Sequence, residues 1–324
     1  MTEERRIPRY DELPAIELTG DRHAWHVWGE GDQLGTINFL TPERVAAAAR
    51  LVRQGRVISL NLPLDQPYPS LMDDSGRKRF VHHQYVNRGG RDDSLDGFYL
   101  QFSSQWDGLK HIRYREFGYY GGLQDADLDD RGLLGIEHQS RHGIVGRGVL
   151  LDLPRHLARR GTPLTPRTRV PVDGALLEEI AAAQGVAFQP GDILLLRTGF
   201  LAWWQSLDQP ERDALHGTLH PNEGGIEWAG LDAHRETAAW LWDHQVASVC
   251  ADNPSVEALR VEREVGFQHR RLIALLGMPL GEFWDLEALA ADCAQDGVYE
   301  FMLTGAPLNL PGGVGSRANA YAIK

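Results

Sequence analysis

Asp192-Ile193-Leu194-Leu195-Leu196-Arg197 is the stretch that decides the fold class. Its four consecutive apolar residues predict a strand buried on both faces, because a half-exposed strand alternates apolar with polar residues. Gly148 to Asp152 and Val246 to Cys250 have the same character, and helical segments over 173–184 and 232–245 separate these strands. Strands alternating with helices predict an α/β fold, a mixed sheet covered by helices.

The flanking sequence adds further elements and two long arms. A helix begins at Thr41-Pro42 and ends at Gly55, since a threonine N-cap, a proline in the first turn and a closing glycine mark its limits. We also predict a strand over 57–60, a helix over 285–295, a strand over 299–303 and irregular chain over 113–142. Residues 1–40 form an N-terminal arm, and residues 63–96, rich in Pro, Gly, Asp and Arg, form a long loop or arm. Since no composition break divides the chain, residues 1–324 form one domain.

The bulk composition narrows the class of protein. A formal net charge of -12 argues against a nucleic-acid partner, because phosphates would be repelled. The first residues hold no apolar run typical of a signal peptide, and no run is long enough for a membrane span. Cys250 and Cys293 lie in apolar stretches, which favours reduced buried thiols over a disulfide. We therefore expect a soluble cytoplasmic protein that acts on a small molecule.

Common catalytic motifs are missing from the sequence. It holds no Gly-x-Ser-x-Gly elbow, no His-Glu-x-x-His helix and no Gly-x-x-x-x-Gly-Lys loop. Gly146-Arg147-Gly148 precedes a strand instead of following one, so it is no dinucleotide fingerprint. These absences argue against a serine hydrolase, a zincin or a nucleotide cofactor.

Polar groups gather in Gln101-Phe102-Ser103-Ser104-Gln105-Trp106-Asp107-Gly108-Leu109-Lys110-His111. If the first half is extended, Gln101 and Gln105 lie on one face, and if the chain turns helical after Trp106, Asp107 and His111 share a face. Strand-to-helix junctions of this kind often form active sites in α/β proteins. The spacing alone favours a purely structural Asp–His pair.

This stretch resembles the signature of the cyclase family, which includes bacterial kynurenine formamidases and isatin hydrolases. The family signature is His-x-Gly-Thr-His-x-Asp-x-x-x-His, and laid on this chain it spans Gln101 to His111. The resemblance covers most of the chain and implies the family's swivelling β/α fold. It also includes Trp28 to Thr36, Gly143 to Leu150, Gly191-Asp192-Ile193, Asp252 to Glu257 and Ala306 to Gly313.

The resemblance assigns roles to several residues. Asp107 matches a metal-ligating aspartate and His111 the catalytic acid/base, whereas Gln101 and Gln105 occupy the positions of two histidine ligands. Glu236 resembles the family's downstream glutamate. His220 resembles the downstream histidine ligand, while Trp106, Phe117 and Tyr119 are expected to border a cyclic or aryl substrate.

The two glutamines leave the cofactor open, because a carboxamide oxygen is a weaker ligand than imidazole. If a divalent metal such as manganese, zinc or magnesium is retained, its ligands are Asp107, Glu236, His220 and Gln105. If the metal is lost, Gln101 and Gln105 bind the substrate, and Asp107 and His111 act as the acid/base pair with Glu236 nearby.

The resemblance implies a hydrolase that cleaves the C–N amide bond of an aryl formamide, as in tryptophan catabolism, or a lactone bond, with metal-activated water and His111 as acid/base. A second hypothesis is a metal-independent cyclase, dehydratase or isomerase of secondary metabolism that uses Asp107 and His111. A third is an inactive binding module. Family members are commonly homo-oligomers, so we expect a dimer or tetramer, with the 63–96 arm as a subunit contact.

Overall fold

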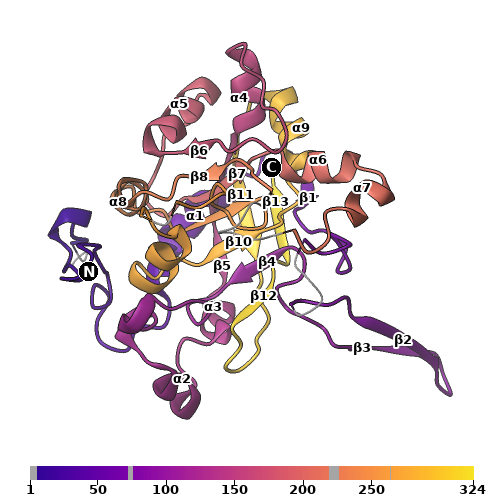
Figure 1. The fold of residues 1–324 in the computed structure, drawn as a ribbon, viewed down its shortest axis with the longest axis horizontal. Helices are drawn as coiled ribbons and strands as arrows, with labels where there is room; N and C mark the ends of the chain where they lie inside the picture. The colour runs from indigo at the N-terminus through magenta and orange to yellow at the C-terminus, as the bar shows by residue number, and fades with distance from the viewer. Residues whose placement is uncertain (1–5, 72–75, 219–225, 263) are drawn as a thin grey trace.

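A nine-stranded mixed sheet forms the centre of the computed structural model, which describes residues 6–71, 76–218, 226–262 and 264–324 (Figure 1). Its strand order is β1-β13-β11-β5-β7-β9-β10-β4-β12. The central strands β5, β7, β9 and β10 are parallel, and the strands on either side pair antiparallel. The strands are β1 Val57–Ser59, β4 Gln105–Asp107, β5 Ile144–Asp152, β7 Ile193–Arg197, β9 Ser248–Ala251, β10 Leu280–Glu282, β11 Glu300–Gly305, β12 Gly315–Arg317 and β13 Ala320–Ile323.

The apolar strands separate two hydrophobic cores. In β7, Leu194 and Leu196 face the helices α5 (Gly174–Gln184) and α8 (Arg235–Asp243). Ile193 and Leu195 face the opposite core, which includes α9 (Glu287–Asp296). All four side chains are buried, which confirms the prediction of a strand covered on both faces.

Helix termini follow local sequence signals. The helix α1 (Pro42–Ala49) begins at Thr41, whose side chain accepts a hydrogen bond from Arg44 N, but it ends earlier than the predicted Gly55. Gly185 ends α5 with φ at 72°, a conformation that glycine adopts without strain. No helix among the described residues is both long enough and apolar enough to cross a bilayer. The other helices are α2 Asp125–Arg131, α3 Ile136–His142, α4 Leu153–Arg159, α6 Phe200–Ser206 and α7 Gln209–Asp213; short 3-10 or π turns are η1 Tyr10–Glu12, η2 Gly35–Phe39, η3 Arg115–Phe117, η4 Tyr120–Gly122 and η5 Arg270–Leu275.

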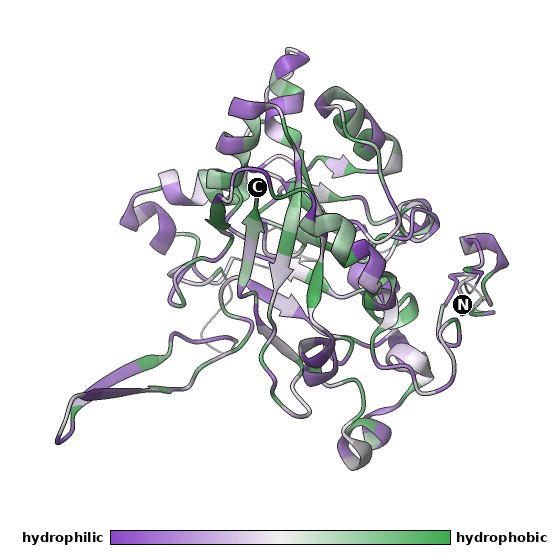
Figure 2. Cartoon of the chain, turned by 180° about the vertical axis from the view of Figure 1, so that it is seen from behind, coloured by the Kyte–Doolittle hydropathy of each residue, from purple (hydrophilic) through white to green (hydrophobic). Residues whose placement is uncertain are grey.

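Two predicted irregular regions contain secondary structure. The 63–96 arm includes an antiparallel hairpin, β2 (Val81–Val86) and β3 (Arg91–Asp96), that projects from the body (Figures 1 and 2). Every residue of both strands is exposed. Their sequences therefore lack the alternation of apolar and polar residues that predicts a half-buried strand. The segment 113–142, expected to be irregular, contains α2 and α3. Each has seven residues, too few for a clear helical periodicity.

Candidate active site

The strand β4 brings Gln105 and Asp107 into the interior on one face of the sheet. Both side chains are fully buried, and β4 lies between β10 and β12, with Glu282 directly opposite Gln105. The chain before β4 is bent, not extended as predicted, and a turn follows it in which His111 N donates to Gly108 O. This turn, rather than a helix, returns His111 toward Asp107.

The two glutamines direct their amide nitrogens at the carboxylates. Gln105 Nε2 lies 2.6 Å from Glu282 Oε2 and 3.2 Å from Asp107 Oδ1. Gln101 Nε2 donates to the same Asp107 Oδ1 and lies 3.0 Å from His111 Nδ1. In this arrangement both amides act as hydrogen-bond donors toward negative charge. The Gln105 oxygen instead accepts from Arg77 Nη1 at 3.3 Å.

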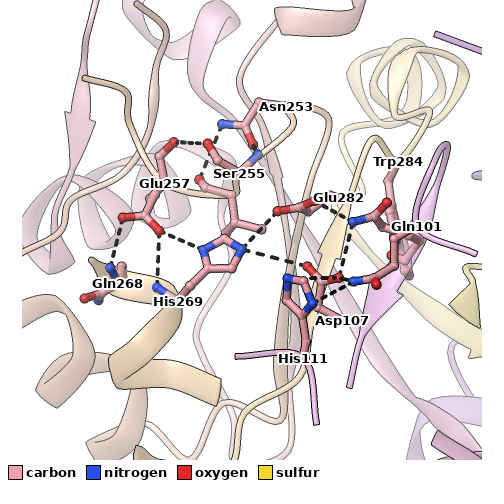
Figure 3. A network of polar contacts seen from close by, with 12 residues as sticks. Gln101, Asp107, His111, Asn253, Ser255, Glu257, Gln268, His269, Glu282 and Trp284 are labelled. Atoms are coloured by element: carbon pink, nitrogen blue, oxygen red, sulfur yellow. Dashed lines mark hydrogen bonds and ion pairs between the residues drawn. The ribbon is translucent and has the colours of Figure 1, made fainter. Parts of the chain in front are cut away.

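A second histidine, His269, lies at the centre of the buried carboxylates (Figure 3). Its Nε2 is 3.0 Å from Glu282 Oε1 and 3.8 Å from Asp107 Oδ2, and its Nδ1 is 2.7 Å from Glu257 Oε1. Glu257 also accepts from the backbone nitrogens of Gln268 and His269. The ring stacks on Phe267 with 5.2 Å between centroids, just before the π turn η5. These contacts hold the His269 ring in one orientation, with each ring nitrogen facing a carboxylate.

His111 is the member of the site that reaches the surface. Its side chain is 23% exposed, whereas that of Asp107 is fully buried, and His111 Nε2 lies 3.9 Å from Asp107 Oδ1. Its ring centroid is 6.5 Å from that of His269. A substrate could therefore reach His111 without displacing the buried carboxylates.

The environment gives the site's groups different protonation preferences. Burial lowers the pKa of His111, and the positive charges of His269 and Arg77 lower it further, which outweighs Asp107. Burial alone would also lower the pKa of His269, but the hydrogen bonds that its ring donates to the carboxylates of Asp107, Glu257 and Glu282 raise it well above its ordinary value. Burial and the neighbouring Asp107 raise the pKa of Glu282 to about 7. Burial would likewise raise the pKa of Asp107, yet His111, His269 and Arg77 hold it far below its usual range. A neutral His111 thus lies beside an ionised Asp107.

Three of these residues could hold a divalent cation. Asp107, His269 and Glu282 offer ligand atoms that all lie within 4.8 Å of one another. Asp107 Oδ2 is buried and has no hydrogen-bond partner among the described residues, which is the expected state of a ligand atom without its ion. Carboxylate and imidazole ligands suit manganese and zinc. Gln105, expected as a further ligand if a metal is retained, directs its NH2 group at Asp107 and Glu282.

Several residues predicted for the site lie elsewhere. Glu236 is exposed in the first turn of α8, away from the buried carboxylates, so the structure does not support it as catalytic residue or ligand. The indole of Trp106 is on the opposite face of β4, fully buried against Trp284, because neighbouring strand residues point to opposite faces. It is therefore core, not substrate wall. His220 lies outside the described residues.

The two other aromatic candidates also contact different parts of the molecule. Phe117 packs beside Tyr114, near the end of η5, and the hydroxyl of Tyr119 donates to Asp125 at 2.9 Å. The structure does not join either ring to the Asp107 cluster.

Sequence reasoning did not assign His269, Glu282, Glu257 or Arg77. Glu282 was detectable as the polar residue that ends a buried apolar stretch, residues 272–281, and His269 lies shortly before that stretch, separated from it by Arg270 and Arg271. Glu257 lies in the segment from Asp252 that shares the family resemblance. Arg77 carries no local signal, because it lies in the loop-rich arm.

Comparisons with known proteins show which family this chain resembles. The family described as "Putative cyclase" matches residues 39–258. A solved structure described as a novel cyclase is 35% identical, with a TM-score of 0.78 over 93% of this chain and 99% of that one. No curated protein matches.

Two isatin hydrolases share the fold at lower identity. Isatin hydrolase A from Labrenzia aggregata, bound to benzyl benzoate, is 14% identical with a TM-score of 0.57 over 83% of this chain and 94% of its own. Isatin hydrolase A from Ralstonia solanacearum is 16% identical with a TM-score of 0.57 over 87% and 97%. The family match and the 35% identical structure together establish that this chain belongs to the cyclase family.

Proposed function

We propose that the protein is a hydrolase that cleaves the C–N amide bond of a small aryl formamide-like substrate or the lactone bond of a small cyclic one. The observation that carries this proposal is the partly exposed, neutral His111 beside the ionised, buried Asp107. A neutral imidazole within reach of substrate can accept a proton from water, and hydrolysis of an amide or ester needs such a base.

The protein's own residues define the proton path. If the Gln101 amide donates to His111 Nδ1, the neutral ring carries its hydrogen on Nε2, which faces Asp107. For Nδ1 to act as the base, the Gln101 amide moves away and a water takes its place; the water then gives its proton to Nδ1, and Asp107 stabilises the imidazolium that forms. His111 then returns the proton to the leaving nitrogen or oxygen. Asp107 therefore orients the base and does not itself exchange the proton.

A divalent cation fits beside this pair, held by Asp107, His269 and Glu282. When bound, such an ion supplies a Lewis acid that lowers the pKa of water and polarises a carbonyl. Glu257 orients His269 for this role through the 2.7 Å contact to its Nδ1. The metal-activated form of the hydrolase is the first version of the proposal.

The glutamine amides favour a second version without metal. Gln101 and Gln105 already direct N–H groups at Asp107 and Glu282, and the Gln105 oxygen faces Arg77. These contacts balance the carboxylates with hydrogen-bond donors in place of a cation. A metal-independent cyclase, dehydratase or isomerase could then use Asp107 and His111 as its acid/base pair.

The experiment is a substrate panel of aryl formamides, lactones and cyclic imides, assayed before and after chelation. Hydrolysis that chelation abolishes and manganese or zinc restores supports the metal-activated hydrolase. Turnover that survives in protein shown to be metal-free supports the second version. A protein that converts none of these compounds contradicts the hydrolase and favours the inactive binding module.

We further propose that the 63–96 arm contacts a second subunit in a dimer or tetramer. Its hairpin exposes Val81, Tyr85, Val86 and Leu95, and a two-stranded hairpin is marginally stable in isolation. A monomeric mass in solution would contradict this proposal.

A further inference from the structure

Arg77 is a half-buried residue of the 63–96 arm that contacts both glutamines of the candidate active site. Its Nη1 donates to the backbone oxygen of Gln101 and lies 3.3 Å from Gln105 Oε1. Arg77 and Gln101 line a cavity of about 10 Å³, which has room for little more than one water molecule. The guanidinium is thus part of the site's own hydrogen-bond network.

The Gln105 amide lies between this guanidinium and two carboxylates. Its Nε2 is 2.6 Å from Glu282 Oε2 and 3.2 Å from Asp107 Oδ1, while its Oε1 faces Arg77. The reverse orientation would bring the amide oxygen against two carboxylate oxygens and the NH2 group against a guanidinium, so all three contacts would be lost. The charges on both sides of the amide therefore select one orientation.

This orientation decides what Gln105 offers to a cation. Asp107, His269 and Glu282 have ligand atoms within 4.8 Å of one another. A carboxamide binds metal through its oxygen, because its NH2 group is a hydrogen-bond donor only. As long as Oε1 accepts from Arg77, Gln105 directs only N–H groups at the carboxylates and adds no ligand.

Arg77 also acts on the cluster through its charge. Burial raises the pKa of Glu282, and the positive charge of Arg77 is among the interactions that oppose this rise. A nearby positive charge weakens the binding of every divalent cation, whatever ligands that cation prefers. A change in the Gln105 orientation differs, since it alters the number of oxygen ligands and hence the preference among metals. The two contributions can therefore be separated by experiment.

We propose that Arg77 is a positioning residue that holds the Gln105 amide as a hydrogen-bond donor and so keeps its oxygen from a divalent cation. When Arg77 is removed, the amide can turn and offer Oε1 as an additional ligand. The inference goes beyond the proposed hydrolase, because it concerns the ligands of the cluster and holds for any reaction at His111. It places control of the metal preference in the 63–96 arm.

The test measures manganese and zinc binding by calorimetry on the chelator-treated full chain. In Arg77→Met the amide can turn, and an added carboxamide oxygen favours manganese over zinc. We expect manganese affinity to rise about tenfold more than zinc affinity, since the charged hydrogen bond that opposed the turn contributes in that range. Arg77→Lys should stay closer to the wild type, because its ammonium group can still donate to Oε1.

Arg79→Met is the matched control, because it removes an exposed arginine of the same arm that pairs with Asp65. It should leave both affinities unchanged. Gln105→Met removes the amide, so Arg77→Met added to it should no longer change the ratio of manganese to zinc affinity. A thermal melt of each variant in chelator checks that the compared proteins are folded.

The inference fails if Arg77→Met raises manganese and zinc affinity equally, because Arg77 would then act through its charge alone. A gain in the ratio that persists in the Gln105→Met background would show that the amide is not involved. Unchanged affinities in Arg77→Met, or no binding of either metal by this variant and the wild type, would remove Arg77 from metal binding. These measurements do not depend on turnover, so the hydrolase proposal is tested separately by the substrate panel.

Discussion

Two clusters of buried charge lie in the same sheet, and they are built differently. In the first, Arg147 donates to both oxygens of Asp192 at 2.9 and 2.8 Å and to Glu300 at 2.6 Å. In the second, Asp107 and Glu282 lie close together around His269, and Asp107 Oδ2 has no hydrogen-bond partner among the described residues.

The difference separates a structural cluster from a chemical one. The Arg147 cluster pairs its charges within the chain: burial raises the pKa of Asp192 to about 6, but both Asp192 oxygens accept hydrogen bonds from Arg147. The Asp107 cluster places like charges together, leaves one ligand atom open and raises the pKa of Glu282 to about 7. Strongly shifted pKa values beside an accessible histidine are typical of functional sites. The predictions below test whether the two clusters differ in this way.

The largest expected effect is on catalysis. His111→Ala should lower kcat/KM by about a hundred- to ten-thousandfold, because a positioned general base contributes in that range. The melting temperature should change little, since the ring is partly exposed and its contact with the buried Asp107 is long, at 3.9 Å. Kinetics with the best substrate of the panel test the loss of kcat/KM, and a thermal melt of the same sample tests the melting temperature. Wild-type kcat/KM in this variant would remove His111 from the mechanism.

The structural cluster should show the opposite pattern. Arg147→Met leaves Asp192 buried without its partner and should lower the free energy of unfolding by about 3–5 kcal/mol. Activity per folded molecule should be retained. Arg113→Met is the control, because the Arg113–Asp125 pair is exposed and should contribute at most about 1 kcal/mol. Denaturant unfolding gives the comparison, and equal losses for the two variants would contradict the assignment of Arg147.

The fold was largely predictable because its information is local. Apolar strands such as β7, and capped helices such as α5 with Asp173 and Gly185, carry their structure in adjacent residues. The strands β10 and β12 were missed, since each has three residues and forms by pairing across the sheet, β12 with β4 and β10 with both β4 and β9. The β2–β3 hairpin was missed for another reason, since all its residues are exposed and give no apolar pattern.

The site was predictable only in part. Asp107 and His111 are four residues apart, so their proximity follows from the local chain. His269 and Glu282 reach Asp107 because β4 pairs with β10. Glu282 is 175 positions after Asp107 in the sequence, so no local pattern joins them. Glu236 was selected because its segment resembles the family's downstream glutamate. It is exposed on α8, so a resemblance outside the signature did not predict a buried site residue.

The affinity of the site for a divalent metal should depend on Gln101 and Gln105. Replacing Gln101 and Gln105 with histidine should strengthen manganese or zinc binding by at least about tenfold, because imidazole is a stronger ligand than a carboxamide. Calorimetry on chelator-treated protein measures the change. His269→Ala in the same background should abolish the gain, since the ion would lose one of its shared ligands. If neither the two histidine replacements nor His269→Ala changes the metal affinity, any bound metal lies outside this cluster.

The smallest effect concerns the pH dependence of stability. In the folded protein the pKa of Glu282 is raised from 4.5 to about 7. Its contribution is present below pH 4.5, where both states are protonated, and is lost as the pH rises through about 7. In the presence of chelator, the wild type should therefore lose melting temperature relative to Glu282→Gln as the pH rises from acid to neutral. Glu227→Gln, in the exposed pair with Arg260, is the surface control. A difference between wild type and Glu282→Gln that stays constant with pH would show that Glu282 titrates as an ordinary carboxylate, and the Asp107 cluster would then resemble the Arg147 cluster more closely than its geometry indicates.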